Sequence, residues 1–143
     1  MTQEQKELLL KDLCARLPYG VKCKDDTLDF TGIMTDISMH DNMCKLYNDY
    51  GDNYTCYMMN CKPFLFPMSS MTEEQEKDIF HNGEFYFDHH NSLCRFSRYE
   101  DDCDFVTMED CLEIFNKLNK YHLDYRGLIP MGLANDATVI NIY

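Results

Sequence analysis

The chain has 143 residues, 45% of them hydrophobic and 27% charged, which is typical of a folded domain and excludes a disordered tail. Its formal net charge of −12 disfavours direct binding to nucleic acid, because a polyanion repels phosphate, and favours a basic protein as a partner. The sequence has neither a signal-peptide pattern nor an apolar run near the roughly 20 residues of a membrane helix. We therefore expect a single cytoplasmic domain over residues 1–143, with no membrane contact.

The first predicted element is a helix over residues 3–17. Thr2 and Gln5 have the spacing of a capping box, and Pro18 disfavours helical angles at the residue before it. The expected apolar face repeats at helical spacing and consists of Leu10, Leu13, Cys14 and Leu17.

A change to a period of two after this helix predicts a sheet. The expected strands are joined by short polar turns, which favours antiparallel pairing, and they cover residues 21–24, 27–37, 43–47 and 54–61. Gly32 interrupts the second strand, where a bulge or sharp bend is the usual reason. The sheet is thus expected to curl towards a small open barrel, with an SH3-like barrel as one candidate.

Two further helices and one or two short strands are predicted in the second half. A connector over residues 62–71 contains Pro63 and Pro67, and capping signals around Thr72 then begin a helix over residues 72–80. Residues 85–87 and 93–96 supply one or two more strands. Thr107 caps a helix over residues 107–121, whose expected apolar face is Met108, Cys111, Leu112, Phe115 and Leu118. The fold class is therefore α+β.

Eight cysteines are present, and without a secretory signal we expect them to be free thiols. No pair has the Cys-x-x-Cys spacing of a zinc site, and the closest pair, Cys56 and Cys61, lies in one predicted strand. We accordingly expect no disulfide, no structural zinc and no cofactor.

Three stretches resemble a family of short uncharacterised proteins from gut Bacteroides-type bacteria and their phages or mobile elements. These stretches are KELLLKDLCARLPYGV (residues 6–21), KPFLFPMSSMT (residues 62–72) and HLDYRGLIPMGLA (residues 122–134). Members of that family often have a tryptophan in the last helix, where this chain has Lys117. The resemblance implies a phage or mobile-element setting and no particular activity.

One segment has the side chains of a metal site. Imidazole and carboxylate groups together bind divalent ions, and here they are His81, Glu84, Asp88 and His89. The spacing matches no established motif, and Asn82-Gly83 predicts a turn that would separate the two halves of the segment. Surface histidines at a turn are the alternative.

Two other segments are candidate binding sites. An acidic run, Glu100, Asp101, Asp102 and Asp104, lacks the ordered spacing of a calcium loop, so it is either a solvated loop or a contact for a basic partner. The second segment, Asp124, Tyr125 and Arg126, follows the third helix. It either binds a ligand or serves the helix end, with Arg126 donating to the last carbonyls and Gly127 adopting a positive φ angle.

Phosphate-binding glycine loops and the common nucleophile elbow are absent from the sequence. We therefore expect a non-enzymatic accessory or interaction protein of a bacterial mobile element or phage. One version is an acidic inhibitor that occupies a basic site on a host protein. The alternative is a small-molecule-binding or metal-dependent protein that uses residues 81–90.

Overall fold

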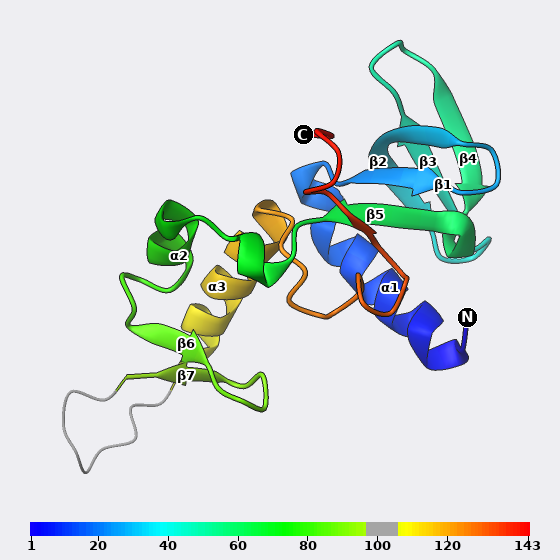
Figure 1. The fold of residues 1–143 in the computed structure, drawn as a ribbon. Helices are drawn as coiled ribbons and strands as arrows, with labels where there is room; N and C mark the ends of the chain where they lie inside the picture. The colour runs from blue at the N-terminus through cyan, green and yellow to red at the C-terminus, as the bar shows by residue number, and fades with distance from the viewer. Residues whose placement is uncertain (97–105) are drawn as a thin grey trace.

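The computed structural model describes residues 1–96 and 106–143 and combines helices with a mostly antiparallel sheet (Figure 1). The α-helices of the described part are α1 (Gln3–Arg16), α2 (Glu73–Ile79) and α3 (Met108–Lys120). Its strands are β1 (Lys22–Asp25), β2 (Phe30–Ser38), β3 (Met43–Tyr47), β4 (Asn53–Tyr57), β5 (Cys61–Leu65), β6 (Phe85–Phe87), β7 (Leu93–Arg95) and β8 (Asn135–Asp136). The predicted α+β class is confirmed.

Each α-helix begins at the threonine that the sequence marks as its cap. A capping box satisfies the first backbone N–H groups of each helix, in the pairs Thr2 with Gln5, Thr72 with Gln75, and Thr107 with Asp110. After α1 the chain makes a short 3₁₀ turn, Leu17–Tyr19, and leaves it at Gly20 with a φ angle of 67°. No helix in the described residues is long and apolar enough to cross a membrane.

The main sheet has the strand order β4-β3-β2-β1-β5-β8. All neighbouring strands are antiparallel except β5 and β8, which pair in parallel through Phe64 with Asn135 and Leu65 with Asp136. The sheet is open, with β4 and β8 as its two edges, and the described residues form no barrel. The predicted curl into an SH3-like barrel is therefore not seen.

The strand predicted over residues 54–61 is in fact divided. A 3₁₀ turn, Met58–Asn60, separates β4 from β5, and β5 continues into the stretch that the sequence marked as a connector. Pro63 suggested a loop because proline cannot donate to a ladder. In β5, Pro63 lies where the two ladders meet. The pairing with β1 covers Cys61 to Pro63, and the pairing with β8 begins at Phe64.

Gly32 is present because two backbones approach closely, and the bulge expected there lies elsewhere. A Cβ atom at residue 32 would lie 2.7 Å from the carbonyl oxygen of Tyr47 on β3, which is too close for any side chain. The register of β2 against β3 shifts between Met34 and Asp36. The bulge is thus a few residues further along the same strand.

Two hydrophobic clusters form the core. The first packs α1 against the main sheet, and the second joins α2 and α3 to the β6–β7 hairpin (Figure 1). The apolar faces predicted for the helices are partly wrong. In α1 the buried residues are Leu9, Asp12, Leu13 and Arg16, whereas Cys14 is exposed. In α3 they are Ile114, Leu118 and Asn119, whereas Met108 and Leu112 are exposed.

Candidate functional site

The residues of the predicted metal segment each contact a different partner and do not converge. His81 Nε2 lies 3.2 Å from Glu113 on α3, and Glu84 pairs with Arg95 across the hairpin. Asp88 accepts hydrogen bonds from the backbone N–H groups of Ser92 and His90, and these bonds lower the pKa of its carboxyl group. Together with His89, whose ring lies against that of His90, these residues form no group of ligands on a common centre in the described chain.

The segment after α3 is engaged in structural contacts. Asp124 is buried and accepts hydrogen bonds from the backbone N–H groups of Leu128 and Ile129, both at 2.8 Å. Arg126 lies over the ring of Tyr125, 4.5 Å from its centroid, and donates to Asp12 on α1 at 2.7 Å. The expected bond from Arg126 to the last helix carbonyls is not formed, although Gly127 does have a positive φ angle of 72°.

The predicted acidic run, Glu100, Asp101, Asp102 and Asp104, lies outside the described residues. This run contributes to the acidity of the second half of the chain, since residues 72–143 carry fifteen acidic and six basic residues, a net charge of −9.

An aromatic groove of about 540 Å³ lies between α2 and the β6–β7 hairpin. The chain reverses after α2 through three successive residues with positive φ angles, His81, Asn82 and Gly83, and so brings β6 back beside the helix. Phe85 is buried and Phe87 partly buried, whereas Tyr86 between them points outward, as strand alternation requires. The ring of Phe96 lies against that of Tyr86 with centroids 4.4 Å apart and a tilt of 34° between the ring planes, and the two residues are 58% and 38% exposed.

Acidic side chains border this groove. Glu73 and Glu76 of α2 both line it, and Glu73 is paired with Lys77 at 2.6 Å. Within the described ranges no cation lies at ion-pair distance from Glu76. Residues 72–96 carry six acidic and two basic residues, which gives a net charge of −4. The groove is also lined by Lys77, the partner of Glu73, so it combines exposed aromatic rings with one more acidic than basic side chain.

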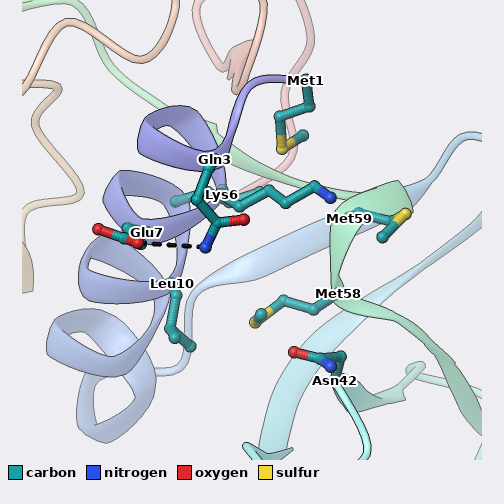
Figure 2. A pocket seen from close by; sticks show the side chains of 9 residues that line it. Met1, Gln3, Lys6, Glu7, Leu10, Asn42, Met58 and Met59 are labelled. Atoms are coloured by element: carbon teal, nitrogen blue, oxygen red, sulfur yellow. Dashed lines mark hydrogen bonds between the residues drawn. The ribbon is translucent and has the colours of Figure 1, made fainter.

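A second pocket, of about 270 Å³, lies between α1 and the turn that follows β4 (Figure 2). Leu10 of the helix and Met58 of the turn face each other across it, and Met1 and Met59 lie near its mouth. Five of its nine lining residues are methionine or leucine, so it offers mainly van der Waals contact and few directed hydrogen bonds. We assign no role to it.

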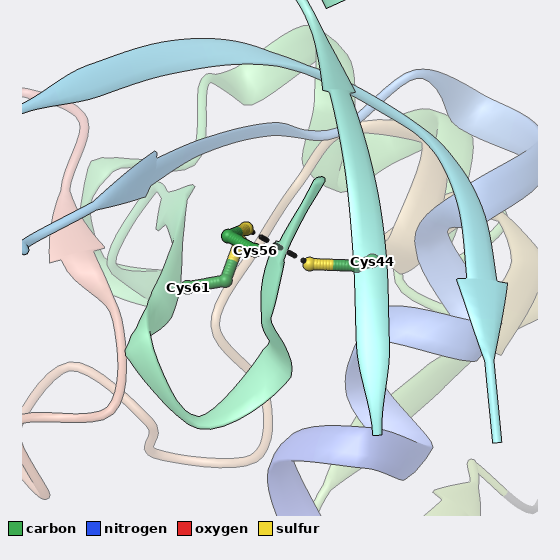
Figure 3. Close-up of side chains that lie close together, drawn as sticks. All are labelled: Cys44, Cys56 and Cys61. Atoms are coloured by element: carbon green, nitrogen blue, oxygen red, sulfur yellow. Dashed lines mark hydrogen bonds between the residues drawn. The ribbon is translucent and has the colours of Figure 1, made fainter. Parts of the chain in front are cut away.

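Three cysteine side chains converge inside the main sheet (Figure 3). The sulfur atoms of Cys44, Cys56 and Cys61 all lie within 4.8 Å of one another, and all three residues are buried. No local cysteine spacing marks this cluster, because Cys44, Cys56 and Cys61 belong to three different strands. The available signal was the hairpin register, which makes Cys44 and Cys56 direct partners on neighbouring strands.

No protein-family model, curated protein or solved structure matches this chain.

Proposed function

We propose that the protein is a non-enzymatic interaction protein that holds a basic segment of a partner protein in the aromatic groove between α2 and the β6–β7 hairpin. The observation that carries the proposal is that the exposed Tyr86–Phe96 ring pair lines the same groove as Glu76, whose carboxylate has no ion-pair partner among the described residues. Cations are attracted to aromatic faces, and arginine in particular combines such stacking with hydrogen bonds to carboxylates.

The protein already uses this chemistry internally. Arg126 lies over the ring of Tyr125 and at the same time donates to the carboxylate of Asp12. In the groove the ring pair and the carboxylate are in place and a guanidinium group is the complementary part. An arginine-rich segment would supply that guanidinium group, which supports a basic partner.

The wider charge supports the same class of partner. A net charge of −12 speeds the approach of a basic protein and repels nucleic acid. We propose an accessory role of this kind in a phage or mobile element, in which the protein occupies a basic surface of a host protein. The alternative metal-dependent function at residues 81–90 has less support, since His81, Glu84 and Asp88 have other partners.

The test uses a nona-arginine peptide and isothermal titration calorimetry. The double variant Tyr86→Ala with Phe96→Ala should bind the peptide about tenfold more weakly than the parent, because two exposed cation–π contacts contribute about 1 to 2 kcal/mol. The matched control removes two exposed tyrosines outside the groove, Tyr50 in the turn between β3 and β4 and Tyr57 at the end of β4; Tyr50→Ala with Tyr57→Ala should bind like the parent.

Melting curves must first show that both double variants remain folded. Equal weakening by the two variants would mean that the peptide follows the net charge alone, and the groove would then have no part in recognition. Chemical-shift mapping with the same peptide provides a second readout, which should be centred on Glu76, Tyr86 and Phe96.

A further inference from the structure

The cysteine cluster is built from β3 and β4, which are neighbours in the sheet, and from the first residue of β5, which pairs with β1 and not with either of them. Cys44 on β3 and Cys56 on β4 are direct cross-strand partners, and their sulfur atoms are 3.4 Å apart. The 3₁₀ turn Met58–Asn60 then carries the chain round to β5, where Cys61 points back towards the other two (Figure 3). These three residues are at most 3% exposed.

A fourth cysteine lies beside this group. Cys23 on β1 is fully buried, and β1 pairs with β5 so that Asp25 is opposite Cys61 and Cys23 is its diagonal neighbour on the same face. A hydrogen bond with the thiol of Cys23 is the main reason that the pKa of Cys61 is raised. Cys23 is therefore a neighbour of Cys61 at the border of the three-cysteine cluster.

The spacing of the sulfur atoms suits a tetrahedral metal ion. Zinc–sulfur bonds of about 2.3 Å place the sulfur atoms of a tetrahedral site about 3.8 Å apart. The sulfur atoms of Cys44 and Cys56 are 3.4 Å apart, and that of Cys61 lies within 4.8 Å of both, so small side-chain rotations bring these three to the required spacing. A disulfide would require a much larger approach, since its sulfur atoms are only about 2.05 Å apart.

We propose that Cys44, Cys56 and Cys61 bind a zinc ion as thiolates, with Cys23 as the fourth ligand. Each thiol that coordinates the ion releases one proton, so no oxidant or reductant takes part. Sulfur donors select thiophilic ions, and four thiolates in a closed site are typical of structural zinc. The ion would connect β1, β3, β4 and β5, and so would stabilise the main sheet. This site is separate from the aromatic groove and does not depend on its function.

The experiment titrates cobalt(II) into metal-free, fully reduced protein. One equivalent should produce the sulfur-to-cobalt charge-transfer band and the strong visible bands of tetrahedral thiolate coordination, and zinc should then abolish them by displacement. Cys44→Ser and Cys56→Ser should each lower the affinity for the metal by at least about 100-fold, since even outer-shell changes cost 10 to 100-fold. The matched controls, Cys14→Ser on the exposed face of α1 and Cys94→Ser in the β6–β7 hairpin, should bind like the parent.

Two measurements keep the result decisive if a buried serine impairs folding. Circular dichroism first shows whether each serine variant is folded, and an unfolded serine variant is replaced by the alanine variant of the same cysteine. Independently, the melting temperature of the parent should rise with added zinc. Absence of the cobalt bands from parent protein with all thiols reduced would overturn the proposal. Unchanged binding by folded variants of Cys44 and Cys56 would do so too, as would binding of copper(I) but not of zinc.

Discussion

At the scale of single residues, His122 is a buried histidine in an environment that opposes its charge. It is 8% exposed, and its ring stacks on that of Tyr143 with centroids 4.6 Å apart. Burial, together with the nearby Arg16 guanidinium, lowers the pKa of His122 to about 4. The neighbouring Asp12 carboxylate acts in the opposite direction but does not outweigh these two effects. The folded protein therefore keeps this ring neutral in mildly acidic solution.

This environment predicts a pH dependence of stability. Between about pH 6.5 and pH 4 the unfolded chain binds a proton at residue 122 and the folded chain does not, so the free energy of unfolding should fall as the pH falls, by about 3 kcal/mol. His122→Asn should lose this part of the dependence, and asparagine tolerates the positive φ angle of 54° at this position. Urea unfolding at a series of pH values measures the difference.

The control for this prediction is His40→Asn, which changes an exposed histidine in the turn after β2. Its stability should follow the parent at every pH. If the profile of His122→Asn also ran parallel to that of the parent, residue 122 would take up its proton equally in the folded and unfolded states.

At the scale of secondary structure elements, we expect the packing of the buried face of α1 to contribute strongly to the free energy of unfolding. Leu13 is fully buried against the main sheet, so Leu13→Ala should lower the free energy of unfolding by about 2 to 5 kcal/mol. Leu112→Ala on α3 makes the same chemical change at a residue that is 59% exposed, and should cost less than about 0.5 kcal/mol. Thermal or urea unfolding compares the two, and similar losses would contradict the helix faces that the structure shows.

The elements that depend on local signals could be predicted from the sequence. Thr2, Thr72 and Thr107 cap helices because a side-chain oxygen meets N–H groups only three residues away. The positions of β1, β2 and β3 likewise follow from alternation and turn residues, whereas the division of residues 54–61 into β4 and β5 and the pairing of β6 with β7 do not. β8 could not be predicted, since its two residues pair with β5 some 70 positions earlier, as Asn135 does with Phe64.

The helix faces and the cysteine cluster depend on partners that are distant in the sequence. Asp12 and Arg16 are charged and so read as solvent-facing, yet they are buried because each satisfies the other. Similarly, Cys44 and Cys61 come together only once β3, β4 and β5 are folded. The groove was missed because the exposure of Phe96 depends on how the hairpin packs.

At the scale of the whole molecule, an ion-pair network joins the two hydrophobic clusters. Asp12 accepts two hydrogen bonds from Arg16, at 2.7 and 3.0 Å, and one from Arg126 at 2.7 Å. Arg16 also donates to the carbonyl oxygen of Leu123 at 2.8 Å, and Leu123 belongs to the second cluster. We therefore expect the two clusters to unfold together rather than separately.

Removing the shared carboxylate should be costly. Asp12→Ala leaves the guanidinium of Arg16 buried without its counter-ion, so we expect a loss of about 3 to 5 kcal/mol in the free energy of unfolding. Asp36→Ala removes the partner of Lys45 from a surface pair whose two side chains are each 57% exposed, and should cost no more than about 1 kcal/mol. Urea unfolding followed by circular dichroism measures both, and an equally small loss for Asp12→Ala would show that the network contributes little.

Residues 135–143 contain the edge strand β8 of the main sheet, and the late synthesis of this strand affects how the sheet folds on the ribosome. Tyr143 accepts a hydrogen bond from the backbone of Lys22 on β1, donates one to the carbonyl oxygen of Phe64 on β5, and stacks on His122. A nascent chain can pair β1 to β5 as soon as these strands emerge, but the outer edge of β5 has no partner strand until β8 is translated. During that interval the exposed edge is open to pairing with other nascent chains, so translation speed through the second half bears on the yield of folded protein.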